Sequence, residues 1–542
     1  MTTMNLASGI DPLNLTAAVK TELEQALQAH IAALQEQAKK DLKAKDAEIH
    51  AKDLKIQALT LELAHLRRIR YGVKSGALSQ VQRDLFEETW NTDLAAVAAE
   101  VEQLDQPTSP VAKPKRPRAG RQPLPAHLPR IEHRHEPDSC QCGRCGKDLV
   151  KIGEDITEQL DVEPAKVFVH RHIRSQYACK ACEIITAAPV PPALIDGGMA
   201  AVGLLVWVLV CKFLDHLPLY RLEQIAARDQ VILSRSTLAD WVGRLGVALQ
   251  PVADRLAEHL KQRSTLHADE TPVPQLDPGS GKTKKAYLWT YRSNDLEPGP
   301  PIVVFDYQPG RSGEHVKNFL DGWHGHLMVD DYGGYKHLFA PNREGAPPCT
   351  EGACFAHARR KFFDLHQAKQ SPMAHEALQR IGRLYEIERQ AKDVSIEDRK
   401  QLRQDLAVPE LEALHQWLIQ TRAQTANGGG SAKALDYTLK RWPALIRYAE
   451  TGHLPIDNNP VENAIRPIAL GKKNWLFAGS ERAGKRAAAI QTLLGTAKLN
   501  GLDPAAWLSD TLEKLPTHPN SRIDELLPFP PAPIEQQPEQ TG

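Results

Sequence analysis

Two cysteine pairs with the spacing C-x-x-C constrain the fold of this chain more than any other feature. Five of the eight cysteines lie between Cys140 and Cys182. Each pair presents two thiolates from one tight turn, and four sulfurs complete a tetrahedral Zn²⁺ site that holds a small β-rich module together. The predicted structural zinc ligands of this zinc-binding domain, residues 131–186, are Cys142, Cys145, Cys179 and Cys182. Cys140 is a spare thiol that can replace one of them, and the alternative is a set of chance cysteines in a reducing compartment.

Composition excludes several classes of protein. The 67 basic residues balance the 67 acidic ones, which argues against a protein that coats nucleic acid by bulk positive charge. The strongest apolar run, residues 199–211, is shorter than the roughly 20 residues that a membrane-spanning helix needs, so we expect a buried core helix and no membrane partner. A secretory signal is not visible either, which predicts a cytoplasmic protein.

Apolar residues recur every seven positions within residues 17–71. This pattern predicts a leucine-zipper-like coiled coil and therefore a homo-oligomer; a single amphipathic helix on the protein's own core is the alternative. The seam residues are Leu42, Ile49, Ile56 and Leu63. An acidic helical segment follows at 72–106. A basic, proline-rich linker then covers 107–130 and either stays solvated or lies along DNA phosphates.

Residues 187–250 predict a helical, helix-turn-helix DNA-binding domain. Ser234 or Ser236 caps its second helix. Arg235 and Arg244 flank that helix and are candidate DNA contacts. Any pair of packed helices has the same pattern, so the signal is weak on its own.

Residues 255–490 have the pattern of a catalytic domain. The strand-like runs are 265–271, 286–291, 302–307 and 326–335, with a helix beginning near residue 310 before the last of them. Three antiparallel-type strands, a helix and a further strand follow the order of the ribonuclease-H-like fold. We therefore expect a multidomain α/β protein with such a core. Asp269 lies on its first strand and Asp330 at the end of its fourth.

Glu462 completes the candidate catalytic set. Two divalent cations that share oxygen ligands need a third carboxylate, and Glu462 lies at the start of a late helix that Asn458 or Asn459 caps. Hard carboxylate ligands fit Mg²⁺ or Mn²⁺. Residues 361–450, between the last two acids, predict a helical insertion. Residues 491–542 form a C-terminal segment and tail.

Cations around these acids are candidate DNA contacts. One group lies at the start of the insertion and would bind DNA phosphate; the alternative is a solvated helix start. His357 in this group is also a candidate proton shuttle. A second group, with an interleaved aromatic residue, follows Glu462. The candidates are His357, Arg359, Arg360, Lys361, Arg466, Lys472, Lys473 and Trp475. Residues 479–485 also satisfy the spacing of a phosphate-binding P-loop, although Arg486 stands where Ser or Thr would hold Mg²⁺.

These strings together resemble a DDE transposase of the insertion sequence 66 family. The matching strings are Leu66-Arg-Arg-Ile-Arg-Tyr-Gly72, Gly120-Arg-Gln-Pro-Leu-Pro125, the two C-x-x-C pairs, Ser234-Arg-Ser-Thr-Leu-Ala-Asp-Trp241, Ala268-Asp-Glu-Thr271, Val329-Asp330, Ala356-His-Ala-Arg-Arg-Lys-Phe362, Asn458-Asn-Pro-Val-Glu462 and Gly471-Lys-Lys-Asn-Trp-Leu-Phe-Ala-Gly-Ser480. The resemblance implies that Asp269, Asp330 and Glu462 are the catalytic triad. Asp331 and Asn463 depart from the family pattern, so Asp331 is a competing acid.

The resemblance implies a bacterial, nucleoid-associated enzyme that binds the ends of an insertion sequence and catalyses two-metal phosphodiester hydrolysis and strand transfer. It also implies small accessory proteins encoded nearby. Two alternatives belong to other classes of protein: a P-loop nucleotidase, and a catalytically inert, zinc-containing DNA-binding regulator. The two remain open on sequence alone.

Overall fold

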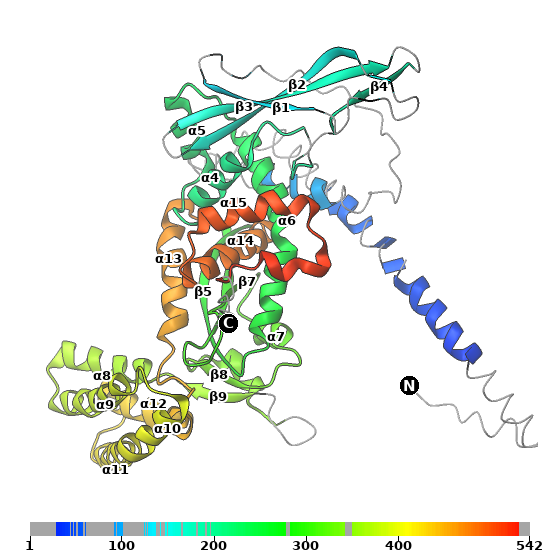
Figure 1. Ribbon diagram of the computed structural model, residues 1–542. Coiled ribbons are helices and arrows are strands. Elements are labelled where there is room, and N and C mark those ends of the chain that lie inside the picture. Colours follow the sequence, from blue (N-terminus) through cyan, green and yellow to red (C-terminus); the bar gives the residue numbers. More distant parts are fainter. Residues whose placement is uncertain are drawn as a thin grey trace, which may run out of the picture. The chain divides into compact units, whose positions relative to one another are not determined.

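The computed structural model describes residues 201–277, 282–341 and 349–530 without interruption, together with parts of 29–60, 91–100 and 124–200. The chain divides into two compact units (Figure 1). One unit comprises residues 1–76 with 97–114, and the other comprises residues 77–96 with 115–542.

The first unit contains helical residues within the predicted coiled coil. Residues 29–43 and 52–57 are helical. The seam residues Leu42, Ile49 and Ile56 are exposed in the single chain, which leaves their apolar side chains available to a second helix. Leu63, the fourth seam residue, lies outside the described residues. Pairing of two such helices stays a prediction.

The predicted zinc-binding region forms a four-stranded sheet in the second unit. Its strands are β1 (Arg130–His135), β2 (Val150–Glu163), β3 (Lys166–Cys179) and β4 (Ile184–Ala187). β2 and β3 pair as an antiparallel hairpin, β1 adds parallel to β3, and β4 pairs with the end of β3. The candidate zinc ligand Cys179 is therefore the last residue of β3.

Three helices follow this sheet. They are α4 (Val202–Phe213), α5 (Leu219–Arg228) and α6 (Arg235–Leu260). Most of the apolar run at 199–211 lies in α4, which is a core helix, as predicted. The Ser234 side chain caps α6 by accepting from the Thr237 N–H. None of the helices in the described part of the chain is both long and apolar enough to cross a bilayer.

A five-stranded mixed sheet forms the centre of the second unit. Its strands are β5 (Thr265–Asp277), β6 (Lys282–Ser293), β7 (Val303–Gln308), β8 (His326–Val329) and β9 (Thr350–Ala353). The spatial order is β7-β6-β5-β8-β9. β5, β6 and β7 are antiparallel neighbours, whereas β8 and β9 run parallel to β5. Helix α7 (Gly313–Phe319) connects the antiparallel part to the parallel part.

Helix α14 covers β7, the outer strand of this sheet. The last α-helices of the described chain are α13 (Asn459–Trp475), α14 (Glu481–Leu499) and α15 (Pro504–Lys514). On α14, the Thr492 and Thr496 hydroxyls accept from the N–H groups of Phe305 and Val303 on β7 at 2.8 and 3.2 Å. These bonds satisfy backbone groups that an edge strand would otherwise leave unpaired.

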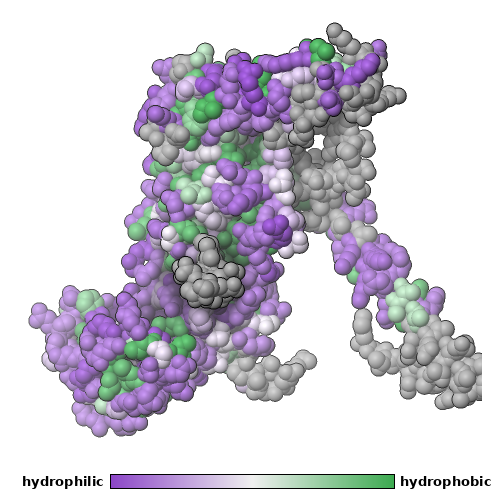
Figure 2. Space-filling model, viewed as in Figure 1, coloured by the Kyte–Doolittle hydropathy of each residue, from purple (hydrophilic) through white to green (hydrophobic). Residues whose placement is uncertain are grey.

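A helical insertion lies between β9 and α13. Its helices are α8 (Phe355–Lys369), α9 (Pro372–Gln390), α10 (Ile396–Leu402), α11 (Val408–Ala423) and α12 (Gly430–Leu445), with a π-helical turn at Arg403–Ala407. They enclose a separate apolar core. Hydrophilic residues cover most of their visible surface (Figure 2). The glycines at 428 and 429 lead directly into α12, which begins at Gly430.

Two buried arginines hold the segment that returns from the insertion to α13. The Arg403 guanidinium donates to the carbonyls of Thr451 and Leu454 at 2.7 and 2.9 Å and pairs with Glu388. Arg399 donates to the carbonyl of Gly452 at 3.0 Å. Residues 451–454 thus have a fixed path toward the start of α13.

A buried ion pair joins the acidic segment to α14. Arg486 and Asp93 are both buried, and their side chains approach to 2.6 Å. The Ser480 hydroxyl donates to the same carboxylate. We expect Asp93→Ala to lower the free energy of unfolding by about 3–5 kcal/mol, because it leaves the Arg486 charge buried without its partner. Denaturant unfolding measures this change.

The matched control is Asp510→Ala, which removes an exposed ion pair with Lys514 and should change stability by no more than about 0.5 kcal/mol. Equal effects of the two substitutions would contradict the importance of the buried pair.

Candidate active site

Asp269 and Asp330 come from two neighbouring parallel strands, near the point where β8 ends. The paired register of β5 and β8 ends with His267 opposite Met328, and its continuation by two residues places Asp269 opposite Asp330. β8 ends at Val329, so Asp330 is the first residue beyond the strand. The Asp330 side chain accepts from the Tyr332 N–H at 2.9 Å, which orients its carboxylate.

Glu462 lies in the first turn of α13, which begins at Asn459. The amide of Asn458 fixes the start of this helix against β5. Its Nδ2 donates to the Ala268 carbonyl at 2.9 Å, and its Oδ1 lies 2.8 Å from the Nδ1 of buried His267. The helix start is therefore bonded to the two residues that directly precede Asp269.

This use of the Asn458 side chain corrects the sequence prediction of a helix cap. Asn458 occupies the cap position, but its side chain makes no capping hydrogen bond. Asn459 is the first helical residue, and its N–H donates to Asp457 Oδ1 at 3.1 Å. Asp457 thus satisfies the first N–H of α13, while the Asn458 amide bonds to β5.

Burial and nearby negative charge change the acidity of Asp269. Burial raises the pKa of Asp269 to about 7, and the charges of Glu270, Asp330 and Glu462 act in the same direction. Like charges that converge in a poorly solvated site disfavour the ionised form of each. Asp330 and Glu462 are therefore close enough to Asp269 to act on it electrostatically.

Glu270, the next residue along β5, belongs to a separate buried network. Its carboxylate accepts from Arg311 Nε at 2.7 Å and from the Tyr335 hydroxyl at 2.7 Å. The Arg311 guanidinium also lies 3.6 Å from the centre of the Tyr332 ring. This network ties the turn after β8 to β5, and burial raises the pKa of Glu270.

Asp331 is engaged by the helical insertion. Lys440 Nζ on α12 lies 3.0 Å from its carboxylate, and the Arg441 guanidinium lies 3.6 Å from it. Arg441 also donates to the main-chain carbonyl of Asp330 at 3.3 Å. The competing acid thus has two basic partners on α12.

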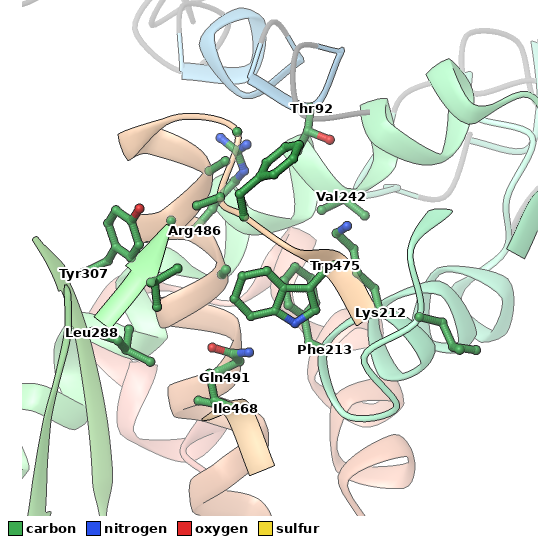
Figure 3. Close-up of a pocket in the computed structure, with 18 residues that line it drawn as sticks. Thr92, Lys212, Phe213, Val242, Leu288, Tyr307, Ile468, Trp475, Arg486 and Gln491 are labelled. Atoms are coloured by element: carbon green, nitrogen blue, oxygen red, sulfur yellow. The ribbon is translucent and has the colours of Figure 1, made fainter. Parts of the chain in front are cut away.

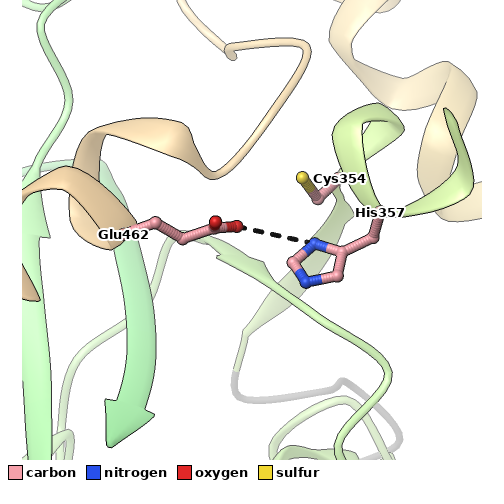
Figure 4. Close-up of side chains that lie close together, drawn as sticks. All are labelled: Cys354, His357 and Glu462. Atoms are coloured by element: carbon pink, nitrogen blue, oxygen red, sulfur yellow. Dashed lines mark ion pairs between the residues drawn. The ribbon is translucent and has the colours of Figure 1, made fainter. Parts of the chain in front are cut away.

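A histidine and a cysteine from the start of α8 lie beside Glu462 (Figure 4). His357 Nδ1 is 3.7 Å from Glu462 Oε1. The potential ligand atoms of Cys354, His357 and Glu462 lie within 4.8 Å of one another. The Cys354 thiol is buried and accepts from the Asn458 N–H at 3.2 Å, and burial raises its pKa to about 12.

Comparison with known proteins identifies the family of this chain. Residues 197–486 match the family described as "Transposase IS66 family". This match covers more than half of the 542 residues. The chain belongs to the IS66 transposase family. The resemblance predicted from the sequence strings is confirmed.

Three further regions match parts of the same family. Residues 492–529 match the IS66 C-terminal element, and residues 139–183 match the zinc-finger binding domain of transposase IS66. Residues 58–132 match a region described as "Transposase C of IS166 homeodomain". A DNA-binding transposase with a zinc-finger domain is the type of protein that these matches support.

Relatives in Sinorhizobium fredii resemble most of the chain. The uncharacterized protein y4jD is 36% identical over 488 residues, which cover 87% of this chain and 94% of the relative. The uncharacterized protein y4qI is 38% identical over 487 residues, which cover 88% of this chain and 89% of the relative.

The zinc-finger match supports structural zinc in this IS66 family member. Of the four predicted ligands, Cys179 ends β3 and is buried, whereas Cys142, Cys145 and Cys182 lie outside the described residues. Gln141 and Asp148, on either side of the first pair, form an antiparallel bridge. This bridge brings together the two ends of the segment that carries the first pair.

The predicted helix-turn-helix contacts lie on a mostly buried helix. α6 continues past the predicted boundary at residue 250 to Leu260, and its apolar face is buried along its whole length. Arg235 is 3.0 Å from Glu223, and Arg244 is 3.2 Å from Asp240. Because α6 is a core helix, we expect only its first turns to be accessible to a DNA groove.

The predicted cationic groups differ in exposure. Arg359, Arg360 and Lys361 are exposed on α8, and Arg466 and Lys473 are exposed on α13. Lys472, in contrast, donates to the Pro272 carbonyl at 3.0 Å, and burial lowers its pKa.

The aromatic residues after Glu462 contribute mainly to packing. Phe477, two residues after Trp475, is buried and is not available for stacking. Trp475 is half-buried and lines an apolar pocket with Phe213, Leu288 and Ile468 (Figure 3). Its ring is therefore only partly available to a nucleobase.

The P-loop alternative does not fit the geometry of residues 479–485. Ser480 caps α14, and residues from Glu481 onward are helical. Lys485 pairs with Glu481 one helical turn away, at 2.8 Å. A P-loop requires consecutive backbone N–H groups in a loop around phosphate, whereas here they belong to a helix.

Sequence reasoning missed the residues that hold the acids in place. His267, Arg311 and Tyr335 have no motif spacing that relates them to Asn458 or Glu270, because each contact joins distant parts of the chain. The alternation of β5 is the one available signal for Glu270, since it places adjacent residues 269 and 270 on opposite faces.

Asn458→Ala tests the bond between α13 and β5. The substitution leaves His267 Nδ1 and the Ala268 carbonyl buried without their partner, so we expect a loss of about 2–4 kcal/mol in the free energy of unfolding. Asn463→Ala, at an exposed position of the same helix, should change it by no more than about 0.5 kcal/mol. Denaturant titration compares the two, and equal losses would contradict the assigned role.

The raised pKa of Asp269 predicts a pH dependence of stability without added Mg²⁺ or Mn²⁺. The usual pKa of 3.8 rises to about 7 in the folded protein. Between these values the folded state binds more protons than the unfolded state, so stability falls as pH rises from about 4 to about 7. Asp269→Asn cannot ionise there and should therefore melt at a higher temperature than wild type at about pH 8.

At about pH 4 the melting temperatures of wild type and Asp269→Asn should converge. The control Asp364→Asn, at an exposed position of α8, should show no such pH-dependent gain. If Asp269→Asn raised the melting temperature by the same amount at both pH values, the predicted titration of Asp269 would be contradicted.

Proposed function

We propose that this IS66 family protein is a DNA transposase that binds the ends of an insertion sequence and catalyses phosphodiester hydrolysis and strand transfer. The observations that carry the proposal are the β5–β8 register, whose continuation sets Asp269 opposite Asp330, and the electrostatic effect of Glu462, in the first turn of α13, on buried Asp269. The sheet order β7-β6-β5-β8-β9, with β8 and β9 parallel to β5, supports a ribonuclease-H-like core.

The donor set at this edge fits divalent cations. Three carboxylates supply hard oxygen ligands of the type that Mg²⁺ and Mn²⁺ prefer. Burial and the neighbouring acids disfavour the ionised form of Asp269, and a cation relieves that repulsion. Two bound cations would activate the attacking water or 3′-hydroxyl and stabilise the leaving oxygen of the phosphodiester.

The protein's own residues hold this arrangement before DNA binds. The Asn458 amide couples the position of Glu462 to that of Asp269. The Glu270–Arg311 pair and the Tyr335 hydroxyl fix the turn that carries Asp330. Such positioning reduces the reorganisation that the site must undergo during reaction.

DNA phosphates would be held by exposed cations near the acids. Arg359, Arg360 and Lys361 follow His357 on α8, and Arg466 and Lys473 lie on the same helix as Glu462. Contacts of this kind position a duplex without reading its sequence. The zinc-binding domain and the first turns of α6 would recognise the element ends, and the coiled coil would pair two protomers.

Substitution of the triad tests the proposed chemistry. We expect Asp330→Ala and Glu462→Gln to reduce 3′-end nicking and strand transfer by at least about a thousandfold, because each removes a cation ligand. Asp331→Ala is the matched control and should stay within about tenfold of wild type, since Asp331 pairs with Lys440 and Arg441. The substrate is a duplex that carries the inverted repeats flanking the gene, with Mg²⁺.

Two outcomes would contradict the proposal. Full activity of Asp330→Ala together with an inactive Asp331→Ala would mean that Asp331, and not Asp330, is the second catalytic acid. Specific binding of the duplex without nicking by wild type, with Mg²⁺ or Mn²⁺ and with any accessory proteins encoded beside the gene, would favour the inert DNA-binding regulator.

A further inference from the structure

The imidazole of His357 has no role in the proposed three-carboxylate site, although it lies next to Glu462. His357 is near the start of α8, and its side chain is directed at Glu462 from the opposite side of the gap between α8 and α13 (Figure 4). Its Nδ1 is buried and has no hydrogen-bond partner among the described residues. A buried polar atom in this state is unfavourable unless a ligand satisfies it.

The separation of the two side chains fits a shared cation better than a hydrogen bond. At 3.7 Å, His357 Nδ1 and Glu462 Oε1 are farther apart than the roughly 2.7–3.2 Å of a hydrogen bond. Two atoms that each bind one cation at about 2.1 Å lie at most about 4.2 Å apart. The observed distance falls within this limit.

Cys354, the third member of this group, has a different role. Its thiol accepts the backbone N–H of Asn458 at 3.2 Å and is buried under the start of α13. The sulfur of Cys354 thus serves to position the start of α13. A soft sulfur ligand is also a poor match for a carboxylate site that holds a hard cation.

We propose that His357 is a nitrogen ligand of the cation that Glu462 binds, so that this cation has a mixed imidazole and carboxylate shell. The inference rests on the proposed function and extends it, because it adds a fourth protein ligand to the three acids. Imidazole binds later transition metals more strongly than Mg²⁺. The site therefore binds Mn²⁺ in preference to Mg²⁺, and His357 causes that preference.

Electron spin-echo spectroscopy of bound Mn²⁺ tests the ligand directly. The probe is Mn²⁺ added at a substoichiometric amount to the full zinc-loaded chain without DNA. Wild type should show modulation from a directly coordinated imidazole nitrogen, and His357→Ala should lose it while still binding Mn²⁺ through the carboxylates. The matched control His366→Ala, on the same helix α8, should keep the modulation.

Metal titrations measure the preference itself. We expect His357→Ala to weaken Mn²⁺ binding by about tenfold and Mg²⁺ binding by less than about threefold, since imidazole contributes little to Mg²⁺ affinity. The far-ultraviolet circular dichroism of His357→Ala should match that of wild type. His357→Gln retains a polar side chain and provides a second variant if the alanine protein fails to fold.

The outcomes separate this inference from the proposed function. Absence of nitrogen modulation in wild type, or its persistence in a folded His357 variant, overturns the ligand role of His357. The proposed function still stands in that case if Glu462→Gln abolishes Mn²⁺ binding at the site and DNA nicking. If Glu462→Gln binds Mn²⁺ and nicks DNA as wild type does, the proposed function itself fails.

Discussion

The carboxamide of Asn458 is the contact on which the geometry of the candidate site depends. β5 and α13 are separated by nearly 200 residues of sequence, and the insertion lies between them. The Asn458 side chain connects the two elements, because it donates to the Ala268 carbonyl and bonds to the ring of His267. A rigid link at the cap residue of a helix determines where a side chain one turn later is placed. The position of Glu462 relative to Asp269 follows from it.

The helical insertion contributes to the same geometry from both of its ends. At its start, α8 carries Cys354 and His357 against α13. At its end, Arg399 and Arg403 bond to the backbone carbonyls of the segment that leads back to α13. Lys440 and Arg441 on α12 pair with Asp331. An insertion of this size therefore supports the site, although it interrupts the sequence between the second and third acids.

The sequence predicted the parts of this structure that depend on local pattern. Runs of strand-forming residues placed Asp269 on β5 and Asp330 at the carboxyl end of β8, although the predicted run at 326–335 is wrong beyond Val329, where the strand ends. The serine at 234 correctly predicted the cap of α6. Contacts between distant residues were not predictable in this way. The sequence around Asn458 predicted that its amide caps α13, but the Asn458 side chain bonds to residues of β5 instead. Likewise Lys472 was a candidate DNA contact because of its charge, and its bond to the Pro272 carbonyl of β5 could not be predicted from the sequence.

The central claim is that three acids from separate elements form one cation site. An anomalous difference map from crystals of the full chain soaked in Mn²⁺ tests it most directly. The account predicts density among the carboxylates of Asp269, Asp330 and Glu462, with Asp331 still paired to Lys440. Density beside Asp331 with none near Glu462, or no density at this edge of the sheet, would contradict it.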